Sequence, residues 1–168
     1  MTRNPEVWLR GPVEGIAPVL QPVAHALLQV AEDLPTVLGG LTPEELWARP
    51  GGSAPIGFHL AHLTGSLDRL LTYARGESLS PEQQAALAAE RAVAEARPGL
   101  AQLLAAFQRT CDAALAQLRA TEAGAVLAAR EVGRARLPST VLGLLFHAAE
   151  HTARHAGQIA TLVKVVRG

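Results

Sequence analysis

The chain has 168 residues, and its 15 Lys and Arg balance its 15 Asp and Glu, so the formal net charge is zero. This length suits one domain with its own core, and the lone cysteine, Cys111, excludes an intramolecular disulfide framework and a cysteine-based zinc ribbon. Zero net charge argues against a nucleic-acid partner, because DNA and RNA binding needs a basic face. No uncharged apolar run reaches the roughly 18 residues of a membrane span, and residues 1–6 lack the apolar core of a secretory signal. We therefore expect a cytoplasmic protein without a nucleic-acid or membrane partner.

Alanine and leucine, with 32 and 26 copies, dominate the composition, and both are strong helix formers. Residues 1–12 are predicted to form an N-terminal arm, and residues 13–168 a single helical domain. The first helix is expected to begin at Val13 or Pro18 and to end at Leu38. Apolar residues three and four positions apart form one stripe along it, as in an amphipathic helix.

A short helix is predicted after Thr42, whose side chain can cap it, and Pro50 stops it. The second long helix is expected to start near Ser53 or Pro55 and to run to about Arg75. Its leucines again fall on one stripe.

The capping box that begins at Ser80 predicts an Ala-rich polar helix ending at Pro98. A third long helix is expected over 100–120, followed by a charged loop over 121–137 in which Val126-Leu127 adds a turn. The last helix is expected from about 138 to 166. Four long amphipathic helices predict an all-α four-helix bundle with short extra helices in the connections.

The histidines gather in two of these helices. Two lie three residues apart in the second long helix and three lie four residues apart in the last one, namely His59, His62, His147, His151 and His155. Residues four apart share one helix face, and here that face overlaps the apolar stripe, so we expect these imidazoles to point into the bundle. Buried neutral imidazoles satisfy one another poorly, because each offers one donor and one acceptor. A divalent cation would instead accept a lone pair from each ring, with His62 or His59 as the ligand from the facing helix.

Other chemical signatures are missing. His151 is not part of a His-Glu-x-x-His motif, and Glu150 lies about 100° away around the helix. Cys111 occupies an apolar helix position, which favours an inert core thiol over a nucleophile. For His25, alone in the first helix, an ordinary core or surface role is favoured.

Two segments resemble a known family. The stretch from Trp47 to Leu63, with its His59-Leu60-Ala61-His62, looks like the first half of a DinB/YfiT-like protein, and the His-x-x-x-His-x-Gly-Gln pattern that begins at His151 looks like its second half. This family is the damage-inducible group of metalloenzyme-like helical bundles, and is distinct from the DNA polymerase of the same name. The resemblance covers about residues 13–167.

The resemblance implies a four-helix bundle with a three-histidine site for zinc, nickel, manganese or iron. The ligands would be His62, His151 and His155. His59 would lie beside these ligands or act as an alternative ligand, and His147 could supplement them. Asp68 would lie outside the ligand set, around the metal site. The resemblance also implies a homodimer, a role in stress response and, for some relatives, transfer of a low-molecular-weight thiol such as bacillithiol.

We therefore hypothesise a metal-dependent thiol S-transferase or hydrolase acting on a small molecule, in which His59 or Asp68 moves the proton. The alternative is a non-catalytic module for dimerisation or small-ligand binding with a structural metal site. In a third interpretation no metal binds, and the buried histidines titrate below pH 6.5.

Overall fold

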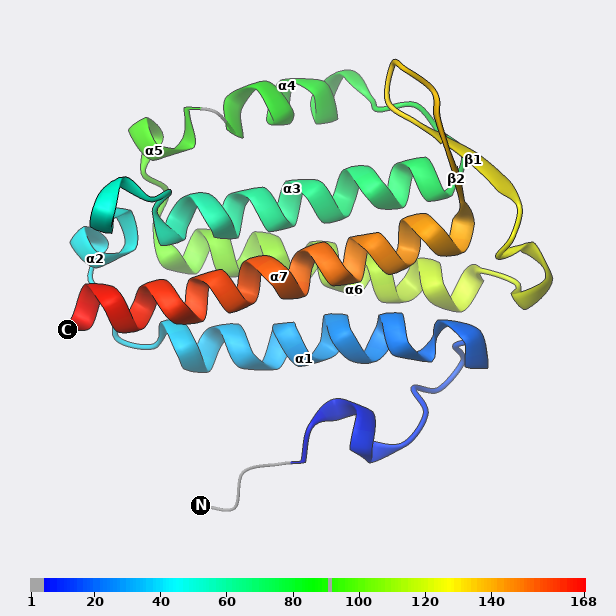
Figure 1. Ribbon diagram of the computed structural model, residues 1–168, viewed down its shortest axis with the longest axis horizontal. Coiled ribbons are helices and arrows are strands. Elements are labelled where there is room, and N and C mark those ends of the chain that lie inside the picture. The colour runs from blue at the N-terminus through cyan, green and yellow to red at the C-terminus, as the bar shows by residue number, and fades with distance from the viewer. Residues whose placement is uncertain (1–4, 91) are drawn as a thin grey trace.

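The computed structural model describes residues 5–90 and 92–168, and its centre is a bundle of four long helices (Figure 1). These helices are α1 (Gln21–Leu38), α3 (Ile56–Ala74), α6 (Leu100–Ala120) and α7 (Val141–Arg167). Helix α7 packs against both α1 and α3, and α6 covers the other side of the same pair. The predicted four-helix bundle is confirmed, and the predicted apolar stripes face one another at its centre.

The core is built mainly from leucines. On α3, Leu60, Leu63 and Leu67 are completely buried, and Leu27 and Phe107 meet them from α1 and α6 with at most 2% of their surface exposed. Burying a side chain of this size stabilises the fold by about 1.5–3 kcal/mol. The spacing of three and four residues in the sequence therefore accounts for the fold.

The first helix begins later than Val13 or Pro18. A 3-10 turn covers Pro18–Leu20, and α1 starts at Gln21 with Pro22 in its first turn, where a missing N–H is harmless. Before it, the 3-10 turn η1 (Val7–Arg10) lies against α1, because Val7 is buried there. The part of the predicted arm before residue 5 lies outside the described residues.

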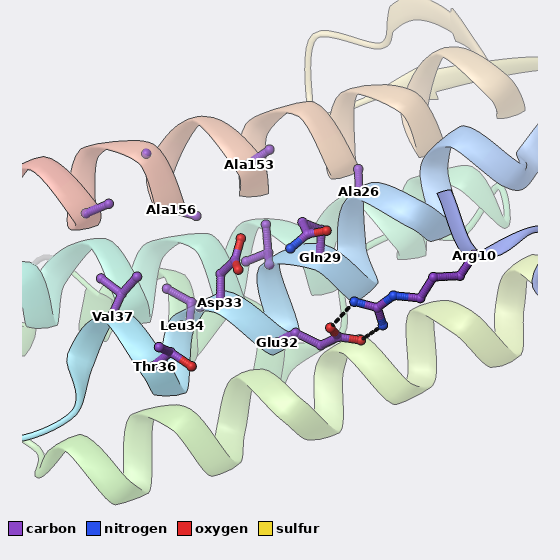
Figure 2. A pocket seen from close by; sticks show the side chains of 13 residues that line it. Arg10, Ala26, Gln29, Glu32, Asp33, Leu34, Thr36, Val37, Ala153 and Ala156 are labelled. Atoms are coloured by element: carbon purple, nitrogen blue, oxygen red, sulfur yellow. Dashed lines mark hydrogen bonds and ion pairs between the residues drawn. The ribbon is translucent and has the colours of Figure 1, made fainter. Parts of the chain in front are cut away.

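A groove runs along the junction of α1 and α7 (Figure 2). Small residues of α7, among them Ala153 and Ala156, form one wall, and Asp33 of α1 stands on the other. Arg10 closes one end by holding Glu32 through two hydrogen bonds of 2.7 and 2.8 Å.

The short helix α2 (Pro43–Trp47) has the predicted capping box: Glu45 N donates to Thr42 Oγ1 at 3.2 Å, and Thr42 N donates to Glu45 Oε2 at 2.8 Å. A 3-10 turn, η3 (Pro50–Gly52), leads from there into α3. The Trp47 ring packs directly over Gly57 in the first turn of α3. A Cβ at Gly57 would lie 2.6 Å from two atoms of that ring, so glycine is required for this contact.

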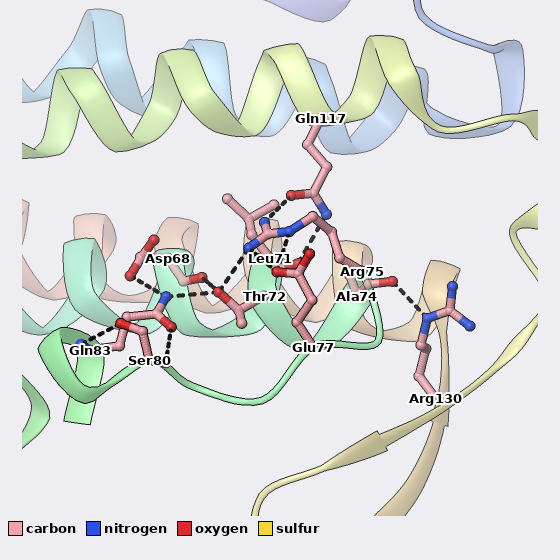
Figure 3. A network of polar contacts seen from close by, with 10 residues as sticks. All are labelled: Asp68, Leu71, Thr72, Ala74, Arg75, Glu77, Ser80, Gln83, Gln117 and Arg130. Carbon is pink, nitrogen blue, oxygen red and sulfur yellow. Dashed lines mark hydrogen bonds and ion pairs between the residues drawn. The ribbon is translucent and has the colours of Figure 1, made fainter.

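The polar helix predicted from Ser80 is broken into α4 (Pro81–Glu90) and α5 (Val93–Ala96). Neither helix has a fully buried residue; Val93 and Ala94 of α5 pack partly buried against the core, and no residue of α4 does. Helix α4 runs along the outer side of α3 (Figure 1) and is fastened there by polar contacts. At its start, Gln83 Nε2 donates to Asp68 Oδ2 and to Thr72 Oγ1, both at 2.7 Å (Figure 3).

The prediction of a loop over 121–137 is only partly correct. After a 3-10 turn, η4 (Ala123–Ala125), the chain forms an antiparallel hairpin of β1 (Ala129–Val132) and β2 (Leu137–Thr140), and α7 starts only at Val141. Each strand has only four residues and none of them is buried, and neither Ala-Arg-Glu-Val nor Leu-Pro-Ser-Thr shows the strict alternation of apolar and polar residues that would predict a strand. The hairpin is held by a distant partner, since Arg130 Nε donates to the carbonyl oxygen of Ala74 at the end of α3 (2.8 Å; Figure 3).

Within residues 5–90 and 92–168, no helix combines the length and apolar character that crossing a membrane requires.

Candidate metal centre

Three histidine side chains from two neighbouring helices converge at the contact between α3 and α7. His62, His151 and His155 each offer one ring nitrogen, and these atoms all lie within 4.8 Å of one another. The ring centroids of His151 and His155 are 4.5 Å apart, and those of His62 and His155 are 4.6 Å apart. The structure thus brings together the three histidines that the resemblance assigned to one metal ion.

Local packing places these rings. On α7, Thr152 and Ile159 are completely buried and fix which side of the helix faces the bundle. His151 and His155 lie at the edge of that side and are half-buried. On α3, the buried Leu60 and Leu63 flank His62 in the same way. The rings therefore stand at the rim of the core, where they are partly desolvated and still reachable.

Each imidazole has a different set of partners. His62 Nδ1 lies 2.5 Å from Glu90 Oε1, and its Nε2 lies 3.0 Å from His151 Nε2. His151 Nδ1 is buried and has no hydrogen-bond partner among the described residues. Phe58 stacks on the His62 ring at 5.6 Å with an interplanar angle of 6°.

His59 lies beside the three converging rings. It is 9% exposed, and its Nδ1 lies 2.9 Å from His155 Nδ1, so one proton can be shared between the two rings. His59 thereby engages one nitrogen of His155 and leaves Nε2 of that ring for another partner. It also lines a shallow, open depression of about 500 Å³ together with Ser53, Arg154 and Gln158.

The prediction that all three histidines of α7 point into the bundle is wrong for His147. Its side chain is 50% exposed, and its Nδ1 lies 3.4 Å from Glu150 Oε2 at the surface. Each step of four residues turns about 40° around a helix. His147, at one end of the row, has therefore rotated out of the contact with α3.

Asp68 is exposed on α3, and its carboxylate accepts the hydrogen bond from Gln83. In the part of the chain that the structure describes, it makes no hydrogen bond to a histidine. His25 lies on α1 with its Nε2 3.1 Å from the carbonyl oxygen of Gly11. Cys111 is fully buried, and burial raises the pKa of its thiol to about 11.

Glu90 is the contact that sequence reasoning missed. It comes from the exposed helix α4, 28 positions after His62, and its side chain is only 11% exposed. Its second oxygen, Oε2, accepts from Arg69 NH1 at 3.1 Å. A single glutamate in an Ala-rich polar helix gives no sequence signal that could single it out.

The electrostatics favour neutral rings. Desolvation by burial lowers the pKa of His59 and of His151, and the nearby His62 lowers both further. The pKa of His155 falls to about 4 because of burial and of the neighbouring histidines. Near neutral pH these imidazoles therefore keep the lone pairs that a metal ion needs.

The donor set fits a divalent transition metal. Two nitrogens bound to one tetrahedral zinc at about 2.0–2.1 Å lie roughly 3.3 Å apart, close to the 3.0 Å between His62 Nε2 and His151 Nε2. Imidazole suits zinc, copper, iron and nickel. Without an ion, these two facing nitrogens share one hydrogen bond at most. The three converging rings could therefore hold a metal ion.

A four-helix bundle in which histidines from two helices meet around one point defines a candidate metal-binding protein. Comparison with family models identifies the family: residues 26–159, well over half of the chain, match the model of the DinB superfamily. The chain belongs to the DinB superfamily. A search of curated proteins finds no match.

Proposed function

We propose that this protein is a metal-dependent enzyme in which His62, His151 and His155 hold one divalent ion, and that it acts as a thiol S-transferase of the bacillithiol type or as a hydrolase. One observation carries the proposal: three imidazole nitrogens converge within 4.8 Å, and no fourth Cys, His, Asp or Glu joins them among the described residues. Structural zinc sites are closed by four protein ligands, whereas catalytic sites have three and keep a position open.

Three neutral imidazoles leave the full charge of a divalent ion in place. When bound, such an ion would lower the pKa of a thiol or water ligand and so supply a nucleophile near neutral pH. His59 is the residue that we propose for proton transfer. It is mostly buried, it lies 2.9 Å from His155 and it lines the open depression, so it can reach a molecule there. The outer role of Asp68 stays a prediction, since its carboxylate is engaged with Gln83.

The depression suits a small polar substrate. Gln158 and Thr161 offer an amide and a hydroxyl group along its wall, and Arg154 adds a positive charge. Arg154 is held in place by Glu150 through hydrogen bonds of 2.5 to 2.8 Å. A low-molecular-weight thiol that carries hydroxyl and carboxylate groups matches these partners better than an apolar ligand does.

The test measures metal and turnover together. The protein is purified without a histidine tag, its metal content per chain is determined, and bacillithiol transfer to a model electrophile is assayed with and without chelator. About one ion per chain and chelator-sensitive transfer or hydrolysis are expected. Stoichiometric metal without either turnover would instead favour the non-catalytic module with a structural site.

The homodimer and the role in stress response belong to the same proposal and rest on the family resemblance alone. The cytoplasmic location also belongs to it and rests on the sequence arguments given above. Which of zinc, nickel, manganese and iron is bound follows from the metal analysis.

A further inference from the structure

We propose that Glu90 is a positioning residue for the metal centre: it holds His62 in the tautomer with the proton on Nδ1, and helix α4 is the element that delivers it. The inference rests on the proposed metal site, and it concerns a residue of α4 outside the three converging histidines. It also assigns a role to α4, which contributes nothing to the core.

The chemistry of the contact fixes the direction of the hydrogen bond. An ionised carboxylate can only accept, so His62 Nδ1 must donate to Glu90 Oε1 across their 2.5 Å separation. The lone pair of the neutral ring is then on Nε2, the atom that lies 3.0 Å from His151 Nε2. Carboxylates bonded in this way to a metal-ligating histidine set its tautomer and raise its basicity.

Helix α3 is shaped to receive this carboxylate. His62, Gly65 and Arg69 follow at i, i+3 and i+7, so they lie along one face of the helix. The Glu90 carboxylate contacts both His62 and Arg69. Because Gly65 has no side chain, there is room for the carboxylate between them. A Cβ at Gly65 would lie 2.9 Å from Glu90 Oε2 and 2.7 Å from Arg69 NH1.

Helix α4 is fastened at both ends by polar side chains and nowhere by a buried one. Gln83 binds Asp68 and Thr72 at its start (Figure 3), and Glu90 binds His62 and Arg69 at its end. The hydrophobic effect therefore contributes little to the packing of α4 on α3. If Glu90 supports the bound state of His62, the metal must in turn stabilise α4 on α3, because such coupling is reciprocal.

The first experiment reads the tautomer in the metal-free protein. Long-range 15N–1H correlation spectra of the His62 ring are recorded for the wild type, for Glu90→Ala and for Gly65→Ala. The Nδ1–H pattern is expected in the wild type and its loss or mixing in both variants, since Gly65→Ala pushes the carboxylate away without removing it. A wild-type ring with its proton on Nε2, or a pattern that neither variant changes, would overturn the proposal.

The second experiment measures Co²⁺ and Zn²⁺ affinity by titration. Glu90→Ala is expected to weaken binding about 10- to 100-fold, and Glu90→Gln less, because its amide oxygen can still accept from Nδ1. The matched control is Glu95→Ala, which removes an exposed carboxylate from α5 that makes no hydrogen bond or ion pair within the described residues. Unchanged affinity in Glu90→Ala, or equal losses in Glu90→Ala and Glu95→Ala, would refute the positioning role.

Amide hydrogen exchange of α4 distinguishes the positioning role from a purely structural ion pair, because such an ion pair would not make the exchange rate of α4 depend on metal. Added Zn²⁺ is expected to slow exchange over residues 81–90 in the wild type and not in Glu90→Ala. Exchange that Zn²⁺ slows equally in both would count against the coupling. A wild type that binds no metal would defeat the proposed function, and the tautomer spectra would still report on Glu90 separately.

Discussion

The contact between Trp47 and Gly57 sets the position of the helix that carries His59 and His62, and the substitution Gly57→Ala tests it. The new methyl group would lie 2.6 Å from two atoms of a ring that is only 6% exposed, so the ring or the helix must shift. Overpacking of this kind costs about 1–3 kcal/mol, and alanine in a helix recovers at most about 1 kcal/mol over glycine. Taking the middle of the overpacking range less the full helix gain, we expect a net loss of about 1 kcal/mol in the free energy of unfolding.

The assay is urea unfolding followed by tryptophan fluorescence in a Trp8→Phe background, which leaves the buried Trp47 as the only reporter. With a urea dependence of about 2 kcal/mol per molar, the midpoint should fall by roughly 0.5 M. The matched control is Gly157→Ala on α7, where an added Cβ meets nothing within 4 Å. That variant should be stabilised by about 0.5–1 kcal/mol. Equal stabilisation by both substitutions would show that the Trp47 contact does not constrain α3.

Three further predictions concern the histidines and the cysteine. Replacing His151 or His155 by Ala should abolish stoichiometric zinc binding, measured by competition with a chromophoric chelator, whereas His25→Ala should bind like the wild type; zinc retained by either site variant would contradict the ligand set. In chelator, stability should decline as pH falls from about 6.5 towards 5, because the lowered pKa values of His59, His151 and His155 mean that the unfolded chain takes up more protons there; a urea midpoint that stays level over this interval would refute the effect. Cys111 should react with a disulfide reagent only on unfolding, since its thiol is buried with a pKa of about 11; fast labelling of the native protein would contradict this burial.

Much of the fold follows from local patterns in the sequence. Leucines three and four residues apart marked each long helix, because a helix must bury one face against its neighbours. The capping box at Thr42 is equally local, and it formed as predicted. The hairpin at Ala129–Val132 and Leu137–Thr140 was missed because its partner is remote: Arg130 binds a carbonyl oxygen 56 residues earlier in the chain.

The histidine site divides in the same way. The spacing of His151 and His155 placed them on one face of a helix, and the resemblance paired them with His62. The same periodicity predicted a buried His147, and this prediction was wrong. Helix packing sets where α7 leaves the contact with α3, and the His147 side chain lies outside that contact. His59 was placed near the ligands, and only the structure shows that it engages His155.

The amino-acid sequence by itself determined the four amphipathic helices, their order and which histidines could share a helix face, because these depend on spacing within a few turns. Tertiary packing decided the rest: that His62 meets His151 and His155, that His147 stays at the surface, and that Glu90 reaches His62 from an exposed helix. The contacts of His62 with Glu90 and with His151 join residues 28 and 89 positions apart. Contacts over such separations depend on how helices pack, and residue spacing within one helix does not predict them.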